Sequence, residues 1–236
     1  MRFSLIIPAY NEESRIGATL SQVSTYLANQ PYDSEIIVVD DGSVDRTREV
    51  VTRDFPGVRV IRYDENRGKG YAVRAGTNAA TGAYRAYYDA DASTPIDELE
   101  KFWLEFERGA AVAIGSRSLP ESRVEVHQPW YRENMGRVFN LLLRAFGLTH
   151  FPDTQCGFKA FTAKACAVIF PRQTVERFGF DAELLYIAQL HGLPIAQVPV
   201  RWINCPHTRV HALADSTRMI SDLLTIRLNA LKGRYR

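Results

Sequence analysis

The chain has 236 residues, of which 46% are hydrophobic and 24% are charged. This composition is that of a globular protein with a full core; it excludes a disordered chain, and the length suits one large domain or two small ones. The net charge of +2 hides an asymmetry, because residues 201–236 carry a net +5, which predicts an anionic partner at that end or a solvated helix face.

Strand and helix patterns alternate over the first 115 residues. Five apolar, β-rich runs predict strands at 2–10, 34–43, 58–64, 84–91 and 110–117. Amphipathic or glycine-bracketed runs predict helices at 12–30, 45–55, 68–82 and 96–109. Continuous apolar strands separated by helices are typical of a mostly parallel sheet with helices on both faces, so the predicted fold class is α/β.

Polar residues follow most of these strands. In parallel sheets ligands bind at the carboxyl ends of the strands, which here are 8–12, 40–43, 64–70, 89–94 and 115–117. Four of these ends carry acids, and one carries Asn66, Arg67 and Lys69. This pattern favours a metal together with a nucleotide diphosphate over a neutral metabolite. The sequence has no P-loop motif, and its glycines at 68, 70 and 76 do not form G-x-G-x-x-G, which disfavours a dinucleotide oxidoreductase.

Two carboxylates, Asp89 and Asp91, lie one residue apart at the end of the fourth predicted strand. Aspartate is common in turns, so this stretch alone fits a turn as well as a metal site. Mg²⁺ and Mn²⁺ take oxygen ligands and often share them with substrate phosphates.

Motifs spread over nearly the whole chain resemble a known family. "SLIIPAYNEE", "EIIVVDDGSVDRT", "ENRGKGYAVRAG" and "YYDADAS" are similar to the nucleotide-binding half of family 2 glycosyltransferases, which have the GT-A fold. "IGSR", "DTQCGFKAF", "FGFDAELLYIA", "VPVRW" and "DSTRMISDLLTIR" resemble the branch that glycosylates polyprenyl phosphates, most of all the dolichyl-phosphate β-glucosyltransferases. Some relatives have "DADG" where this chain has Ala92. The resemblance implies one GT-A domain over 1–236, with a nucleotide-sugar half at 1–117 and an acceptor half at 118–236.

The resemblance also implies a donor site. Its expected nucleotide-sugar-binding residues are Pro8, Tyr10, Glu12, Asp40, Asp41, Asn66, Gly68, Lys69, Asp89 and Ala90. Asp40 is expected against the nucleobase, Asp41 at the adjoining turn or the ribose, and the 66–69 group over base and ribose. Asp89 and Asp91 are expected to hold Mg²⁺ or Mn²⁺, which would neutralise the departing nucleoside diphosphate.

A phosphate acceptor changes what the catalytic groups must do. A sugar hydroxyl needs a general base, whereas a phosphomonoester is already anionic and arginines can position it. The expected catalytic residues are Asp91, Arg117 and Arg201, and the expected acceptor- or sugar-binding residues are Arg132, Arg137, Gln155 and Asp181. Arg132 and Arg137 also fit plain surface positions, and Asp181 also fits a helix-start carboxylate.

The leading functional hypothesis is an inverting, metal-dependent transferase that moves a sugar from a nucleotide sugar to a polyprenyl or dolichyl phosphate, with glucose from UDP-glucose expected. Two alternatives are a GDP-mannose-dependent enzyme and a family 2 transferase with a soluble glycan acceptor. A non-enzymatic nucleotide-binding partner in a membrane complex is disfavoured by the intact aspartate pair. No nucleic-acid partner is expected.

Location is predicted from what the sequence contains. Three scattered cysteines indicate a reducing compartment, and neither a signal-peptide pattern nor an 18-residue apolar run is present. Residues 136–148 and 221–236 combine leucines with basic residues, as do helices that lie in a membrane surface and helices that pack on a core. We therefore expect a cytoplasmic protein in peripheral contact with the cytoplasmic face of a membrane.

Overall fold

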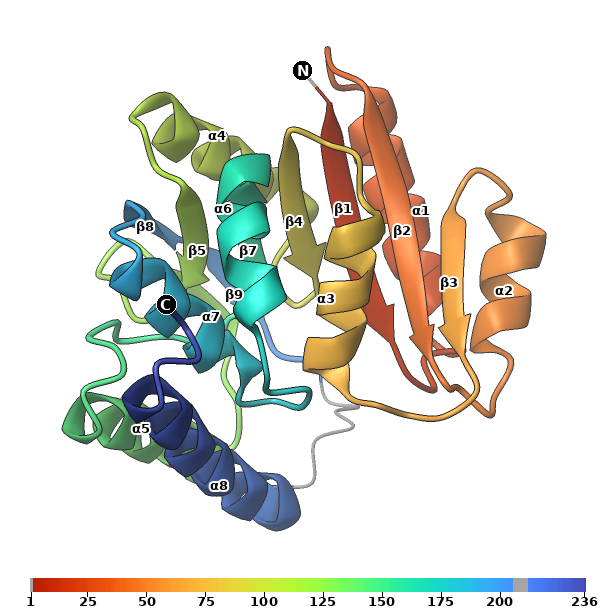
Figure 1. Ribbon diagram of the computed structural model, residues 1–236. Helices are drawn as coiled ribbons and strands as arrows, with labels where there is room; N and C mark the ends of the chain where they lie inside the picture. Colours follow the sequence, from red (N-terminus) through yellow and green to blue (C-terminus); the bar gives the residue numbers. More distant parts are fainter. Residues whose placement is uncertain (1, 206–211) are drawn as a thin grey trace.

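The computed structural model describes residues 2–205 and 212–236, with the side chains of 131–132 and 212–218 outside the description. Its centre is a seven-stranded sheet in the order β3-β2-β1-β4-β7-β5-β8 (Figure 1), in which only β7 is antiparallel to its neighbours. The strands are β1 (Phe3–Ala9), β2 (Ser34–Asp41), β3 (Arg59–Tyr63), β4 (Tyr84–Tyr88), β5 (Val112–Ser116), β7 (Phe158–Thr162) and β8 (Ile195–Pro199). A separate two-stranded sheet pairs β6 (Arg123–Val126) with β9 (Arg201–Ile203).

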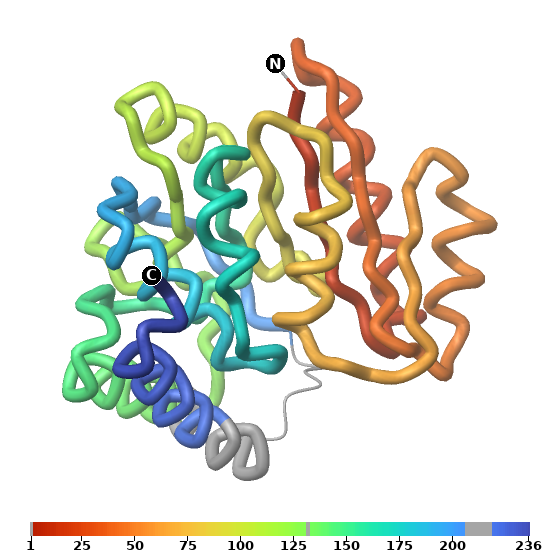
Figure 2. The backbone as a smooth tube through the Cα atoms, in the orientation of Figure 1, coloured from red at the N-terminus to blue at the C-terminus, as the bar shows by residue number. Residues whose placement is uncertain are grey.

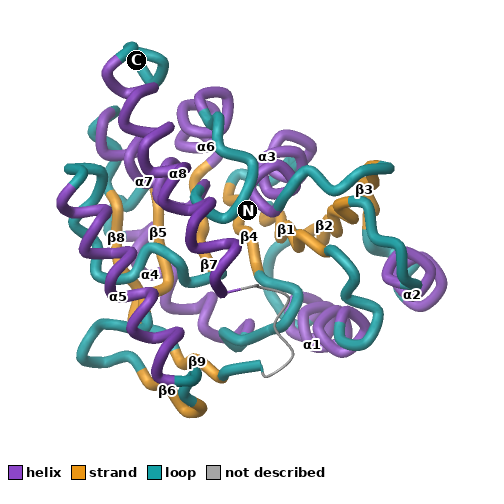
Figure 3. Tube along the Cα trace, turned by 90° about the horizontal axis from the view of Figure 1, so that it is seen from below, coloured by secondary structure: helices purple, strands orange, loops and turns teal. Residues whose placement is uncertain are grey.

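Helices cover both faces of the large sheet, as predicted (Figure 3). They are α1 (Ile16–Ala28), α2 (Thr47–Asp54), α3 (Lys69–Ala79), α4 (Leu99–Glu107), α5 (Trp130–Ala145), α6 (Ala163–Ile169), α7 (Phe180–Leu190) and α8 (Ala212–Leu231), with short 3₁₀ turns at Ile96–Glu98 and Phe170–Arg172. Successive β1 residues point to opposite faces, so Leu5 and Ile7 join the core beneath α1, α2 and α4, while Ile6 joins the core beneath α3, α6 and α7. The two cores hold the strand ends rigidly.

Two expectations need correction. The first helix begins at Ile16 rather than at residue 12, because the backbone N–H groups of Glu12 and Glu13 are bound by Thr47 Oγ1 and an Asp45 carboxylate oxygen, at 2.7 and 3.2 Å. The sequence also does not reveal β7, which inserts between β4 and β5.

The helices α5 and α8 pack against each other beyond the carboxyl end of β5 (Figures 1 and 3). One side of each joins the core, through Phe139 and Leu143 on α5 and through Leu223 and Ile226 on α8. A second set of apolar side chains on the same helices is at least 49% exposed: Val138, Leu141, Leu224, Leu228 and Leu231. Core packing is thus confirmed for one side of each helix, and contact with a membrane surface stays a prediction for the exposed side. Over residues 2–205 and 212–236, no helix is long and apolar enough to cross a bilayer.

Candidate active site

The predicted ligand edge is formed by the loops that follow β1, β2, β3 and β4. After β3 the chain runs along the lower edge of the sheet to α3, beneath the ends of β1 and β2 (Figure 2). Gly42 adopts a left-handed φ of 75°, and a Cβ atom there would lie 2.7 Å from the backbone nitrogen of Asn66. Only glycine lets the β2 and β3 loops approach this closely.

The adjacent aspartates at the end of β2 have different roles. Asp40 is fully buried; its Oδ1 accepts the Ser43 backbone N–H at 2.9 Å, and its Oδ2 has no hydrogen bond among the described residues. Arg62 Nε lies at an ion-pair distance of 3.9 Å from this oxygen. A buried carboxylate oxygen that still lacks a hydrogen bond suits an N–H of a nucleobase. Asp41 instead binds its own protein loop, because its two oxygens accept N–H groups of Arg67, Gly68 and Asn66 at 2.7–2.9 Å. Of the two roles expected for Asp41, the structure favours the turn over the ribose.

The start of α3 is held in place by residues from distant parts of the chain. Gly68 has a φ of 109°, and a Cβ there would lie 2.5 Å from the carbonyl oxygen of Glu176. That carbonyl accepts the Tyr71 backbone N–H at 3.0 Å. The segment 173–176 is in turn anchored by the fully buried Glu183, which accepts N–H groups of Thr174 and Val175 at 2.8–3.0 Å.

Lys69, the first residue of α3, reaches the end of β4. Its Nζ lies 2.5 Å from Asp89 Oδ1. Burial acts to lower the pKa of Lys69, but Asp89 and Asp181 raise it above its ordinary value, so the ammonium is charged. Lys69 was expected to close over the base and ribose. In the structure its ammonium lies beside Asp89, the expected metal ligand.

Asp89 and Asp91 follow β4 in a constrained loop. The Asp89 backbone N–H donates to Gly157 O at 3.1 Å, and a Cβ at residue 157 would lie 1.8 Å from Asp89 Oδ2. Asp91 Oδ1 accepts the Ser93 backbone N–H at 2.9 Å, and Ala92 between them has a left-handed φ of 51°. Asp89 lines a small cavity together with Tyr88, Ser93, Thr94, Gly157 and Trp202.

These carboxylates fit a hard divalent cation that also binds phosphate. Mg²⁺ takes one or two protein carboxylates and completes its shell with phosphates and water. Within the part of the chain whose side chains are described, no cluster of three or more His, Cys, Asp or Glu residues could hold a metal. The two aspartates supply only part of a coordination shell, which leaves room for a donor diphosphate.

Arg117, after β5, is oriented by Asp153. Its Nε and Nη2 donate to the two carboxylate oxygens at 2.7 and 2.8 Å, and its backbone N–H donates to Oδ2 at 2.9 Å. Burial opposes ionisation of Asp153, but Arg117 lowers the pKa of that carboxyl to about 2. The third guanidinium nitrogen, Nη1, makes no hydrogen bond to the described residues, and the Arg117 side chain is 25% exposed.

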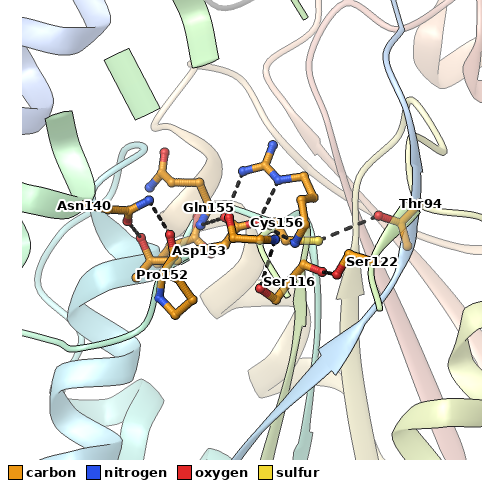
Figure 4. A network of polar contacts seen from close by, with 12 residues as sticks. Thr94, Ser116, Ser122, Asn140, Pro152, Asp153, Gln155 and Cys156 are labelled. Carbon is orange, nitrogen blue, oxygen red and sulfur yellow. Dashed lines mark hydrogen bonds and ion pairs between the residues drawn. The ribbon is translucent and has the colours of Figure 1, made fainter. Parts of the chain in front are cut away.

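Gln155 lies next to this pair. Its backbone N–H donates to Asp153 Oδ1 at 3.1 Å, and its side-chain Nε2 is buried without a hydrogen-bond partner in the described structure. Figure 4 shows Asp153, Gln155 and Cys156 in one stretch between Asn140 and Thr94. An open arginine nitrogen and an open amide nitrogen in one cluster suit an anion.

The other expected arginines lie in different surroundings. Arg201 is committed to two carboxylates, with Nε 2.7 Å from Glu98 Oε1 and Nη2 2.5 Å from Asp97 Oδ2. Arg137 is exposed on α5. The structure does not describe the side chain of Arg132. The histidines at positions 207 and 211 also lie outside the described residues.

Asp181 sits at the start of α7 in a buried charge network. Tyr87 Oη and Lys159 Nζ both donate to its Oδ1, the latter at 2.6 Å, and Lys159 also donates to Cys156 O at 2.6 Å. Protein partners therefore already occupy Oδ1 of this carboxylate. Cys156 is fully buried, and burial raises the pKa of its thiol, as expected for a packing residue rather than a nucleophile.

The remaining expected donor residues lie at or near the β1 exit. Pro8 is half-buried in β1, Tyr10 is 39% exposed, and Ala90 O accepts the Thr19 hydroxyl at 2.7 Å. Glu12 forms an ion pair with Arg15.

Two residues at the site were missed from sequence. Burial disfavours the charged form of Arg15, but Glu12 and Asp91 help to raise its pKa above the ordinary value, which places this cation within electrostatic reach of the aspartate pair. Its sequence signal is a basic residue three positions after Glu12. Gly157 is harder to predict from sequence, because Asp89, its neighbour in space, is distant in the chain.

Comparisons with known proteins agree with this geometry. The glycosyl transferase family 2 model matches residues 4–170. The dolichyl-phosphate beta-glucosyltransferase of Homo sapiens is 34% identical over 255 residues, covering 100% of this chain and 78% of the relative, and that of Saccharomyces cerevisiae is 33% identical, covering 99% and 76%. Glucosyl-3-phosphoglycerate synthase from Mycobacterium tuberculosis, crystallised with Mg²⁺ and UDP, superposes with a TM-score of 0.72 at 21% identity over 95% of this chain and 79% of that one, which shows the same fold. The chain therefore belongs to glycosyl transferase family 2, with the GT-A architecture that the resemblance of its motifs implied.

Proposed function

We propose that this enzyme transfers glucose from UDP-glucose to a polyprenyl or dolichyl phosphate, with inversion at the anomeric carbon and with Mg²⁺ or Mn²⁺. The observation that carries the proposal is the meeting, at one sheet edge, of the Asp89/Asp91 pair with the Arg117–Asp153 pair. Burial acts to lower the pKa of Arg117, whereas Asp153 and, to a smaller extent, Cys156 and Asp89 raise it above its ordinary value. A diphosphate site and an anion site therefore adjoin.

The donor would lie across the ends of β1, β2 and β4. The open oxygen of Asp40 would accept a base N–H, and Asp89 and Asp91 would hold the metal at the diphosphate. When bound, the metal supplies Lewis-acid stabilisation of the departing nucleoside diphosphate. Uracil and guanine both offer an N–H to a carboxylate, so the choice of UDP over GDP rests on the relatives, which are named as dolichyl-phosphate beta-glucosyltransferases.

The acceptor phosphate would bind at Arg117 Nη1 and Gln155 Nε2. A phosphate monoester has a second pKa near 6, so its oxygen is a ready nucleophile at neutral pH. Attack on the anomeric carbon from the side opposite the nucleotide forms the new carbon–oxygen bond as the bond to UDP breaks, which inverts the configuration. This chemistry does not require a free general base and agrees with the ion-paired state of Asp181. It favours lipid phosphate over the soluble-glycan alternative, and the relatives give no support to the GDP-mannose alternative.

The lipid acceptor requires contact with a membrane, and we propose that α5 and α8 make it at the cytoplasmic face. Both helices lie on the side of the molecule toward which β1, β2, β4 and β5 point (Figure 1), and both carry exposed apolar side chains. Exposed basic residues accompany them: Arg137, Arg144, Arg227, Lys232, Arg234 and Arg236. Each basic residue near an anionic bilayer contributes about 1 kcal/mol of attraction, which salt screens.

A substrate panel tests the chemistry. With Mn²⁺ present, we expect turnover of UDP-glucose with a short polyprenyl phosphate, and none with GDP-mannose, with the unphosphorylated prenol or with 3-phosphoglycerate. Asp91→Asn should keep the fold but lose most transfer, because an amide is a weaker ligand for these ions. Full turnover in EDTA, or equal use of the unphosphorylated prenol, would contradict the proposal.

A charge variant tests the membrane contact. Removing the chain after Leu231 is a poor choice, because Tyr235 is fully buried and donates to Glu183 at 2.6 Å. Replacing Lys232, Arg234 and Arg236 by glutamine keeps this tyrosine. We expect the triple variant to sediment less with anionic liposomes at low salt, while binding UDP like the wild type. Equal sedimentation of the two proteins would show that these three side chains do not contact the membrane.

A further inference from the structure

Several carboxylates around the expected metal ligands are already paired with cations. Four cations are matched with four carboxylates: Arg15 with Glu12, Lys69 with Asp89, Arg117 with Asp153 and Lys159 with Asp181. Asp91 makes no ion pair with the described residues and holds the Ser93 N–H instead. Of the two expected metal ligands, Asp91 thus keeps a negative charge that no described cation pairs with, whereas the charge of Asp89 is already matched by Lys69.

Asp89 is the carboxylate whose partner blocks a metal. Its Oδ1 is 2.5 Å from the Lys69 ammonium, and its Oδ2 faces Gly157 so closely that a Cβ there would be 1.8 Å away. A metal ligated by Oδ1 at about 2.1 Å would lie within about 4.6 Å of the ammonium, even on the opposite side of the oxygen. The Lys69 side chain is only 18% exposed, so water screens this repulsion poorly.

We propose that Lys69 is a counter-cation that occupies Asp89 in the donor-free enzyme and makes divalent-metal binding depend on a nucleoside diphosphate. An arriving diphosphate offers oxygens to both cations. The ammonium moves from Asp89 to a phosphate oxygen, and Asp89 becomes available as a metal ligand. The inference rests on the proposed metal-dependent function and adds the order in which its ligands bind.

The start of α3 suits this switch, because only the side-chain end needs to move. The backbone at Gly68–Tyr71 is clamped between the Asp41 loop and the segment 173–176. A lysine carries its charge on a flexible four-carbon stem, whereas an arginine would hold Asp89 in a two-pronged contact. The ammonium can thus change partner while the helix stays fixed.

Metal binding without catalysis tests the idea. Free Mn²⁺ is measured by electron paramagnetic resonance with full-length protein, with and without saturating UDP, for the wild type, Lys69→Met and Lys69→Gln. Lys164→Gln is the matched control, since it removes one exposed lysine from α6. Thermal unfolding of each variant confirms that it is folded. Two different Lys69 variants are used so that the test still stands if one of them does not fold.

We expect UDP to tighten Mn²⁺ binding to the wild type by at least about 100-fold. Both Lys69 variants should bind Mn²⁺ at least tenfold more tightly than the wild type in the absence of UDP. UDP should then increase their Mn²⁺ affinity by a smaller factor than in the wild type. Because coupling between two ligands is reciprocal, Mn²⁺ should increase their UDP affinity by the same smaller factor. Lys164→Gln should behave as the wild type does.

The outcomes separate the two proposals. If the Lys69 variants bind Mn²⁺ in the absence of UDP no more tightly than the wild type, the counter-cation role is wrong, although the metal-dependent function stands. If the wild type does not bind Mn²⁺ even with UDP present, the proposed metal dependence is wrong and the counter-cation role fails with it.

Discussion

Replacing Gly157 by alanine would test how strictly the Asp89 carboxylate must be placed. The added methyl group would lie 1.8 Å from Asp89 Oδ2 and 2.2 Å from its Cγ. Real Cβ contacts essentially never fall below 3.0 Å, so the carboxylate must retreat by at least about 1.2 Å. Rotation away from residue 157 would also disturb the 2.5 Å contact with Lys69.

A displacement of about 1 Å in a catalytic constellation can cost about 100-fold in rate. For Gly157→Ala we therefore expect kcat/KM for UDP-glucose to fall by about 100-fold, or about 2.7 kcal/mol in transition-state stabilisation. Gly57→Ala is the control, because a Cβ there meets nothing within 4 Å. Steady-state transfer kinetics and a thermal unfolding curve for each variant separate lost placement from lost folding. Turnover of Gly157→Ala within threefold of the wild type would refute the steric reasoning.

Three further predictions concern residues beside the site. Arg117→Ala should raise KM for the lipid phosphate while UDP affinity stays near normal, whereas Arg201→Ala should mainly lower the unfolding temperature; a loss confined to UDP affinity in Arg117→Ala would contradict the first assignment. The pKa of Asp153 is depressed to about 2, so its stabilising effect is complete above about pH 4 and is lost as the pH falls toward 2. In urea unfolding between these pH values, the wild type should lose about 2 kcal/mol more unfolding free energy than Asp153→Asn. The same dependence of unfolding free energy on pH in both proteins would contradict this. Tyr235→Phe removes a donor to the buried Glu183 and should cost about 1–3 kcal/mol of unfolding free energy, and an unchanged urea midpoint would contradict this.

The parallel half of the fold, and the polar residues at the ends of its strands, can be predicted from the sequence because both depend on local patterns. Buried strands are continuously apolar, and the acids that follow them stand at fixed positions in the motifs. The strand β7, Phe158–Thr162, escaped prediction because the motif "DTQCGFKAF" reads locally as a polar loop before a helix. Its place between β4 and β5 is determined by pairing with strands that are distant in the chain, and a local pattern does not contain that information.

The same limit applies to individual side chains. Asp41 and Asp40 are adjacent in one motif, yet the fold uses the first to bind its own loop and leaves an oxygen of the second open. From residue type alone, both aspartates are predicted to be polar residues of the site. Only the hydrogen bonds show which one keeps capacity for a ligand, and those bonds depend on how the β3–α3 loop returns under β2.

The surroundings of the two arginines that the motifs suggested as phosphate ligands differ more than their hydrogen bonds do. Arg117 and Arg201 each bind carboxylates through Nε and Nη2. Arg117 is held by Asp153, which is 2% exposed and also fixes the arginine backbone, and it lies within electrostatic reach of Asp89. Arg201 joins β9 to the start of α4 through Glu98 and Asp97, and it is 36% exposed. An anion at Arg117 would gain an oriented cation next to the diphosphate site, whereas an anion at Arg201 would have to compete with two carboxylates for a solvated one. We therefore propose the acceptor phosphate site at Arg117, and we expect Arg201 mainly to fasten β9 to the turn before α4.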